Sequence, residues 1–256
     1  LFGTLDDVAR FAAAGMKELT AAEEKVLQPE TIKSMYTPEI GMSSYYRFVF
    51  EGYGLGHFVE YLPGENTREN GTRAVSHGGQ GSGWMTDFHS VPATGDGIVI
   101  LSNSQRTWPG FAYILTDWAK WLGYASTGMS VIITVQKTAW VLIAVVLGLI
   151  LWQAWRLGEG LVSGRRRFVP LGKRARTAQA AGPLRYAQSA AALVLLVLFL
   201  WITSLDYWFI DSVLPIASPW LNAAALCAAC VLAASALLPK LRTGEKTSGP
   251  GKIEQS

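Results

Sequence analysis

Three long apolar runs constrain the fold of this chain more than any other feature of its sequence. They cover residues 138–155, 186–205 and 219–238, and none of them contains an acidic or basic side chain. A helix of about 20 residues crosses a hydrocarbon core of ~30 Å, whereas helices of globular proteins average about 12 residues. Tryptophan and tyrosine lie near the ends of the runs, as they do at membrane interfaces. The sequence therefore predicts three transmembrane helices rather than buried helices of a soluble protein.

The charges between these runs predict the orientation of the chain. The loop 156–185 carries eight basic residues and one acidic residue, whereas the stretch between the second and third runs holds two acids and no base. Because positively charged loops stay in the cytoplasm, we expect loop 156–185 and the tail 239–256 inside, and residues 1–137 outside, the cytoplasmic membrane. The tail is rich in Gly, Ser and Lys and is expected to be disordered.

The charge distribution and the two cysteines indicate no nucleic-acid partner, no disulfide framework and no cysteine metal site. Residues 1–137 hold ten basic and fourteen acidic residues, so the overall charge of +3 averages two different regions. Arg165–Arg167 could bind anionic lipid or nucleic acid, but orienting the chain in the bilayer explains this run, and no nucleic-acid partner is predicted. Cys227 and Cys230 lie on one turn of the third run and form neither a disulfide framework nor a metal site. We expect them to be small buried residues.

Helix and strand patterns predict an α+β arrangement for the soluble region. Thr4 and Asp7 resemble a capping box that opens a helix with an apolar stripe reaching Leu19, and Pro29 suits the first turn of a second, short helix. After a loop at 37–50, strand patterns occupy 53–60, 73–77, 84–91 and 97–103, and an amphipathic helix covers 111–122. Short, glycine-rich connections predict that the last strands form an antiparallel meander.

A glycine-rich stretch between two of these strand patterns is the candidate functional site. His77 is followed by Gly78, Gly79, Gly81 and Gly83 before the next strand pattern begins at Trp84. Glycine has no Cβ, so these positions allow another backbone or a substrate to come close. We interpret the stretch as the wall of an active site with His77 at its mouth.

Several segments resemble the serine β-lactamase-like hydrolases, which include class C β-lactamases, D-alanyl-D-alanine carboxypeptidase-type penicillin-binding proteins and related esterases. His77-Gly78-Gly79 is similar to their third active-site motif, where class C enzymes carry Lys-Thr-Gly and many members carry His-x-Gly. Further similarity lies in residues 5–11, 26–38, 53–56 and 97–104. The resemblance covers roughly residues 2–123. It implies that residues 1–125 are the C-terminal portion of such a domain, from a bacterial source, fused to the three membrane helices.

The resemblance also implies roles for three residues. His77 would contact the tyrosine of the second motif or the substrate, Gly79 would form part of the wall, and the backbone N–H of Gln80 would donate to the developing oxyanion. The substrate would be a small peptide, amide or ester, and no cofactor is implied. Because histidine titrates near neutrality, activity is predicted to depend on pH between about 5 and 8.

The family's other motifs do not occur in this sequence. No Ser lies three residues before a Lys, and no Tyr lies two residues before an Asn. We expect the chain to be the C-terminal part of a longer hydrolase whose nucleophile lies upstream, and the alternative is a degenerate domain. Whether the chain is an enzyme therefore stays open.

Two other functional hypotheses stand beside the hydrolase, and a metal site is also weighed. The domain could be a non-catalytic module that binds a cell-wall peptide or a partner and signals through the spans. A transport or lipid-handling role is weaker, because the spans contain no ionisable side chain. A metal site formed by His57, His77 and His89 is disfavoured, because their separations match no ligand motif, and ordinary strand histidines are expected. The oligomeric state does not follow from the sequence.

Overall fold

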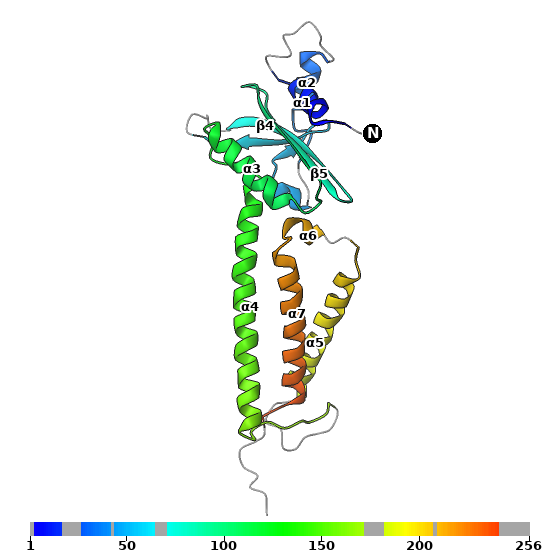
Figure 1. Cartoon of the computed structure of the whole chain (residues 1–256), viewed down its shortest axis with the longest axis vertical. Helices are drawn as coiled ribbons and strands as arrows, with labels where there is room; N and C mark the ends of the chain where they lie inside the picture. The colour runs from blue at the N-terminus through cyan, green and yellow to red at the C-terminus, as the bar shows by residue number, and fades with distance from the viewer. Residues whose placement is uncertain are drawn as a thin grey trace, which may run out of the picture. The chain divides into compact units, whose positions relative to one another are not determined.

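The computed structural model describes residues 3–16, 27–41, 44–64, 71–171, 182–206 and 209–240. The chain divides into two compact units (Figure 1). The first, the sheet unit, comprises residues 1–139 and 209–215, and the second, the helical unit, comprises residues 140–208 and 216–256. The division separates the predicted soluble domain from most residues of the three long apolar runs.

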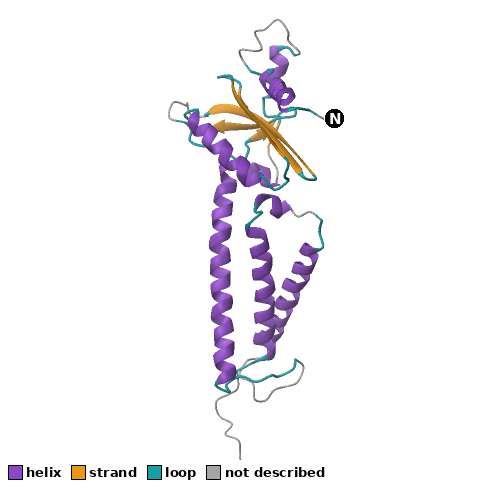
Figure 2. Ribbon diagram, viewed as in Figure 1, coloured by secondary structure: helices purple, strands orange, loops and turns teal. Residues whose placement is uncertain are grey.

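An antiparallel sheet forms the centre of the sheet unit (Figure 2). Its strands pair in sequence order and are β1 (Ile40–Gly41), β2 (Gly52–Tyr53), β3 (Phe58–Leu62), β4 (Thr72–Gly81), β5 (Trp84–Val91) and β6 (Asp96–Ser102). The predicted antiparallel meander and the α+β class are confirmed by this arrangement. The single strand expected at 53–60 was wrong, because a turn at Gly56, with φ of +78°, separates β2 from β3.

Two short helices precede the sheet. The helix α1 (Leu5–Ala13) begins with the predicted capping box, in which the Thr4 N–H donates to Asp7 Oδ2 at 2.7 Å and the Asp7 N–H donates to Thr4 Oγ1 at 3.3 Å. The far end of its expected stripe, Leu19, lies outside the described residues. The helix α2 (Pro29–Met35) has Pro29 in its first turn, as predicted. The expected loop at 37–50 instead contains β1 and the 3₁₀ helix η2 (Ser44–Phe48).

The helix α3 (Trp108–Trp121) crosses one face of the sheet and closes the core (Figure 1). It begins three residues before the predicted start, with Pro109 in its first turn. The fully buried residues Phe111 and Leu115 project from α3 onto Leu62 of the sheet. Met129 and Ile132, at the start of the next helix, complete this core. Burying one such side chain stabilises the fold by about 1.5–3 kcal/mol, so the helix and the sheet depend on each other.

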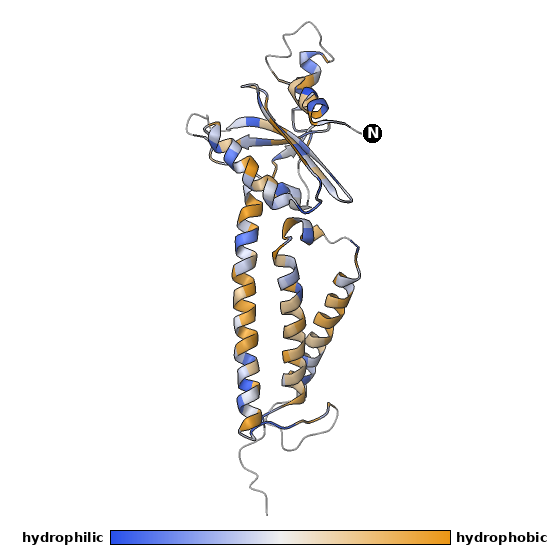
Figure 3. Cartoon of the chain, in the orientation of Figure 1, coloured by the Kyte–Doolittle hydropathy of each residue, from blue (hydrophilic) through white to orange (hydrophobic). Residues whose placement is uncertain are grey.

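Three helices are long and apolar enough to cross a membrane, by length and composition. They are α4 (Ser130–Val162), α5 (Gly182–Thr203) and α7 (Ala217–Leu237), and Figure 3 shows their apolar composition. Each contains most of one predicted span. The first helix extends beyond its run at both ends, and its 33 residues correspond to a length of about 50 Å.

Polar contacts in the helical unit concentrate at the end of α7. Arg185, on α5, donates through Nε to the carbonyl oxygen of Ala236 at 2.7 Å, and Arg166 donates to the carbonyl oxygen of Leu238 at 2.7 Å. Two arginines of the basic loop 156–185 thus satisfy carbonyl groups that a helix end leaves without partners. Cys227 and Cys230 are free and exposed on α7, so the expectation that they are buried was wrong.

Candidate functional site

The three predicted site residues all lie on β4, which continues past the expected end of the strand at His77 to Gly81. Strand β3 pairs with β4 only as far as Ser76, which lies opposite Phe58. Beyond that point, β4 pairs with β5 alone among the described strands. The segment from His77 to Gly81, which we call the exposed edge of β4, is therefore open on one side to side chains from other elements.

The side chain of His77 contacts two aromatic residues. Its Nε2 lies 3.2 Å from the hydroxyl oxygen of Tyr53, and its ring stacks on Phe58 with the ring centres 5.2 Å apart. The sequence indicated a tyrosine partner from a motif outside the chain, whereas the structure supplies one from β2. Tyr53 belongs to the segment 53–56, whose glycines resemble a strand of the family. That resemblance did not indicate the contact between Tyr53 and His77.

Gly79 accommodates side chains of its own hairpin. Its N–H donates to the Thr86 hydroxyl at 3.1 Å. A Cβ at Gly79 would lie 3.0 Å from the Trp84 ring, and one at Gly81 would lie 2.5 Å from the same ring. The space that the sequence assigned to a substrate or another backbone is thus partly occupied by Trp84, whose side chain packs across both glycines.

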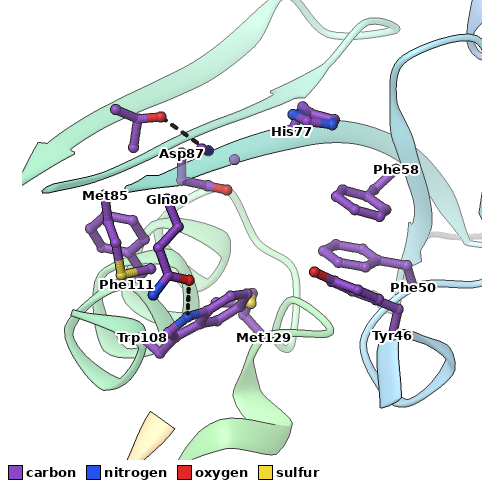
Figure 4. Close-up of a pocket in the computed structure, with 13 residues that line it drawn as sticks. Tyr46, Phe50, Phe58, His77, Gln80, Met85, Asp87, Trp108, Phe111 and Met129 are labelled. Carbon is purple, nitrogen blue, oxygen red and sulfur yellow. Dashed lines mark hydrogen bonds between the residues drawn. The ribbon is translucent and has the colours of Figure 1, made fainter. Parts of the chain in front are cut away.

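Gln80 connects the exposed edge of β4 to two other segments. Its Nε2 donates to the Ser212 hydroxyl at 2.9 Å and to the carbonyl oxygen of Gln105 at 3.2 Å, and its Oε1 accepts from the Trp108 indole at 3.3 Å (Figure 4). Ser212 is fully buried and lies on α6 (Phe209–Val213), the short helix between the second and third apolar helices. Sequence analysis gave a role to the backbone of Gln80 and missed its side chain.

A pocket of about 230 Å³ lies beside this edge (Figure 4). A column of aromatic rings forms one wall, with Phe50 stacked on Phe58 at 4.4 Å and Tyr46 at 5.4 Å from Phe58. The lining residues are Tyr46, Phe50, Phe58, His77, Gly78, Gly79, Gln80, Met85, Thr86, Asp87, Trp108, Phe111 and Met129. All three predicted site residues therefore lie on one pocket, together with a carboxylate that the sequence analysis did not consider.

That carboxylate, Asp87, belongs to a buried charged cluster. Its Oδ2 lies 3.4 Å from Nδ1 of His89, and Nε2 of His89 forms a short hydrogen bond with Oε1 of Glu60. Oε2 of Glu60 accepts the backbone N–H of Gly128 at 2.6 Å. His89 is completely buried and Glu60 is 3% exposed. His89 lies in strand β5, as the sequence favoured, and it is also the centre of an ion-pair cluster that the sequence did not predict.

The cluster changes the pKa values of its members. Burial raises the pKa of Asp87, and the hydrogen bond from His89 opposes this shift. For His89, burial lowers the pKa, but the charge of Glu60 and the hydrogen bond with Asp87 outweigh it and raise the pKa to about 10. His89 is thus protonated at neutral pH and stands between two carboxyl groups.

The third histidine has a different environment. His57 Nδ1 lies 3.1 Å from the carbonyl oxygen of Leu55, and its ring packs against Tyr36 with the ring centres 5.0 Å apart. Burial lowers the pKa of His57. Each of the three histidines has its own partners, and no group of three or more His, Cys, Asp or Glu residues in the described part of the chain is arranged to hold a metal ion.

Comparison with known proteins adds no relative: no protein-family model and no curated protein matches this sequence.

Proposed function

We propose that this chain is part of a membrane-anchored serine hydrolase of the β-lactamase-like family, which cleaves peptide, amide or ester bonds by acyl transfer outside the cytoplasmic membrane. The observation that carries the proposal is the exposed edge of β4, which aligns His77, Gly79 and Gln80 along one pocket of an antiparallel sheet. The family's third motif is expected at such a strand edge.

Acyl transfer requires a nucleophile, a base and donors for the developing oxyanion. In the proposed site His77, hydrogen-bonded to Tyr53, polarises or positions the reacting group, and the backbone N–H of Gln80 is one donor to the oxyanion. The nucleophile and its base would be provided by the family's first two motifs, from residues outside this sequence. The chain would then contribute one wall of the active site and its anchor.

The packing of α6 is in keeping with a chain that crosses the membrane three times. This helix connects the second and third spans, and it belongs to the same compact unit as the sheet. Ser212 donates to the carbonyl oxygen of Gln105 at 2.6 Å, and Asp211 lies 4.0 Å from Arg106. A connection that packs on the sheet domain must lie on the same side of the membrane as that domain. The basic loop 156–185 would then face the cytoplasm.

A non-catalytic binding or sensing module is the second candidate. The observation that favours it is the Trp84 ring, which occupies the space above Gly79 and Gly81 where a substrate backbone would lie. In such a module, the pocket would bind a ligand without cleaving it, and contact between Gln80 and α6 would connect the pocket to the membrane helices.

Labelling of the full-length protein in membranes with a fluorescent fluorophosphonate and a fluorescent penicillin separates the two candidates. The hydrolase should be labelled, and His77→Ala should slow labelling by about 10²–10³-fold, the usual cost of removing one polar group that stabilises the developing charge. Lys120→Ala, at an exposed position on α3, is the matched control and should label at the normal rate. Absence of labelling by both reagents, with other serine hydrolases in the same membranes labelled, would exclude the hydrolase and leave the binding module.

A further inference from the structure

We propose that the pocket beside β4 binds a small ligand that carries an ammonium group on an apolar body the size of an aromatic ring, with the Asp87 carboxylate as its counter-ion. The inference goes beyond the hydrolase, because it applies equally to a binding module. The ligand could also be part of the hydrolase's substrate, and that identification alone rests on the proposed function.

The first argument is the charge balance of the buried cluster. Asp87, His89 and Glu60 bring two carboxyl groups to one imidazolium, so full ionisation leaves one negative charge without a partner. Glu60 uses both oxygens, one on His89 and one on the Gly128 N–H. Within the described part of the chain, Asp87 uses only Oδ2, on His89, and it lines the pocket. An unbalanced negative charge that is largely removed from water is costly, so a proton or a cation from the pocket would stabilise Asp87, whose side chain is 13% exposed.

The second argument is access to the carboxylate. Asp87 lies opposite Gly78 in the register of β4 and β5. A Cβ at Gly78 would contact Asp87 Oδ1 at 3.4 Å and would lie 2.9 Å from the Thr86 carbonyl oxygen. Glycine at this position leaves Oδ1 uncovered on the side of β4. Figure 4 shows Asp87 projecting between His77 and Gln80.

The third argument is the lining of the pocket. The 13 described residues that line it include no lysine or arginine, and His77 is the one lining side chain that can act on Asp87 as a cation. Most of the remaining lining is aromatic or Met, and aromatic rings attract ammonium groups through their negative faces. The sheet unit thus offers a carboxylate at one point and apolar walls elsewhere, which is the chemistry that recognises an amine with an apolar body.

The volume sets the size of the ligand. A cavity of about 150 Å³ accommodates benzene, and this pocket measures about 230 Å³, which leaves room for a ring with an aminomethyl group. Benzylammonium is therefore a suitable probe. Benzyl alcohol has nearly the same shape without the charge and is the matched control ligand. A divalent metal ion fits less well, because it requires about six oxygen ligands and Asp87 is the one carboxylate among the lining residues.

Calorimetric titration of the detergent-solubilised full chain tests the proposal. Benzylammonium should bind at least tenfold more tightly than benzyl alcohol. Asp87→Asn keeps the shape of the side chain and an acceptor for His89, and it should remove this preference. Asp117→Asn, at an exposed position on α3, removes the same charge away from the pocket and should leave the preference unchanged. Equal binding of the two ligands to the natural protein, or no binding of either, would overturn the proposal without reference to any variant.

The pH dependence provides a second test. The groups that act electrostatically on Asp87 are His89, Glu60 and His77. Because burial raises the pKa of Asp87, protons compete with the ligand at low pH, so benzylammonium should bind more tightly as pH rises from 5 to 8. Alkylammonium groups stay protonated over this range, as lysine does. Binding that is constant or weaker at higher pH would count against Asp87 as the counter-ion. If the fluorophosphonate and the penicillin do not label the protein, that result excludes only the proposed hydrolysis. The ammonium site is tested by the titrations alone.

Discussion

The sheet unit and the helical unit position their polar groups in opposite ways. In the sheet unit, the important contacts join distant residues: His89 meets Glu60 from another strand, and Gln80 meets Ser212, 132 positions away in the chain. In the helical unit, most backbone groups bond within their own helix, and a few side chains such as Arg185 complete the ends. The first unit therefore depends on its tertiary contacts, whereas the helices of the second depend mainly on their own sequence.

The largest effect is expected when the charged cluster loses its cation. His89→Leu should lower the free energy of unfolding by about 3–5 kcal/mol, because it leaves the like charges of Glu60 and Asp87 without a cationic partner. Glu60→Gln should cost less, because Asp87 remains as the counter-ion of His89. Thermal unfolding of the detergent-solubilised chain measures both. An equal loss in the two variants would show that the cluster does not act as a charge-balanced group.

Replacing one leucine in each unit with alanine tests whether the sheet unit depends more on tertiary contacts than the helical unit does. Leu115→Ala in α3 should cost about 2–5 kcal/mol, because Leu115 is fully buried between the helix and the sheet. Leu151→Ala in α4 should cost far less, because its side chain is 70% exposed and would face lipid. The same unfolding measurement compares them. A loss at Leu151 as large as that at Leu115 would mean that α4 is packed against a partner at this position.

The same difference explains which features were predictable from sequence. Three helices long and apolar enough to cross a membrane follow from run length and composition alone, and α1 follows from a local capping box. The exposed edge of β4 was located by its glycines. Local patterns could not give the pairing that ends at Ser76, which leaves the edge open.

The charged cluster was beyond local patterns for the same reason. Glu60 and Asp87 each lie in a strand with no unusual spacing to His89, and only the register of β3, β4 and β5 brings them together. Trp84 was seen merely as the start of a strand, although its ring occupies the space above Gly79. The sequence thus indicated the strand segment that lines the pocket and one of its polar side chains, and tertiary packing decided the others.

Stability should decrease on the alkaline side because of the cluster. The pKa of His89 is about 10 in the folded protein and ~6.5 in an unfolded chain, so its contribution is complete below about pH 6.5 and is lost as pH rises through 10. The raised pKa of Asp87 acts in the same direction. The lowered pKa of His57 has the opposite sign and removes stability as pH falls through about 6.5.

Unfolding midpoints measured from pH 5 to 10 should therefore pass through a maximum near neutrality. In Glu60→Gln, the alkaline loss should be smaller and should end at lower pH, because the pKa of His89 falls when the charge of Glu60 is removed. An alkaline limb that is unchanged in this variant would assign the loss to other groups.

The smallest effect is expected at the contact between α6 and the sheet. Ser212→Ala removes a hydroxyl that accepts from Gln80 and donates to the carbonyl oxygen of Gln105, and it should cost about 1 kcal/mol. Gln80 keeps its contacts with Gln105 and Trp108, so the pocket wall should remain in place. Because the lost contact joins α6 to the hairpin, amide hydrogen exchange should accelerate at residues 81–83 and 209–213 and stay unchanged in β3.

Ser102→Ala, which removes a hydroxyl bonded to Thr107 within the same unit, is the matched control and should leave exchange at α6 unaltered. Faster exchange in the control as well, or unchanged exchange in Ser212→Ala, would mean that α6 is held to the sheet by its apolar side chains, such as Phe209 against Trp108, and not by this hydroxyl.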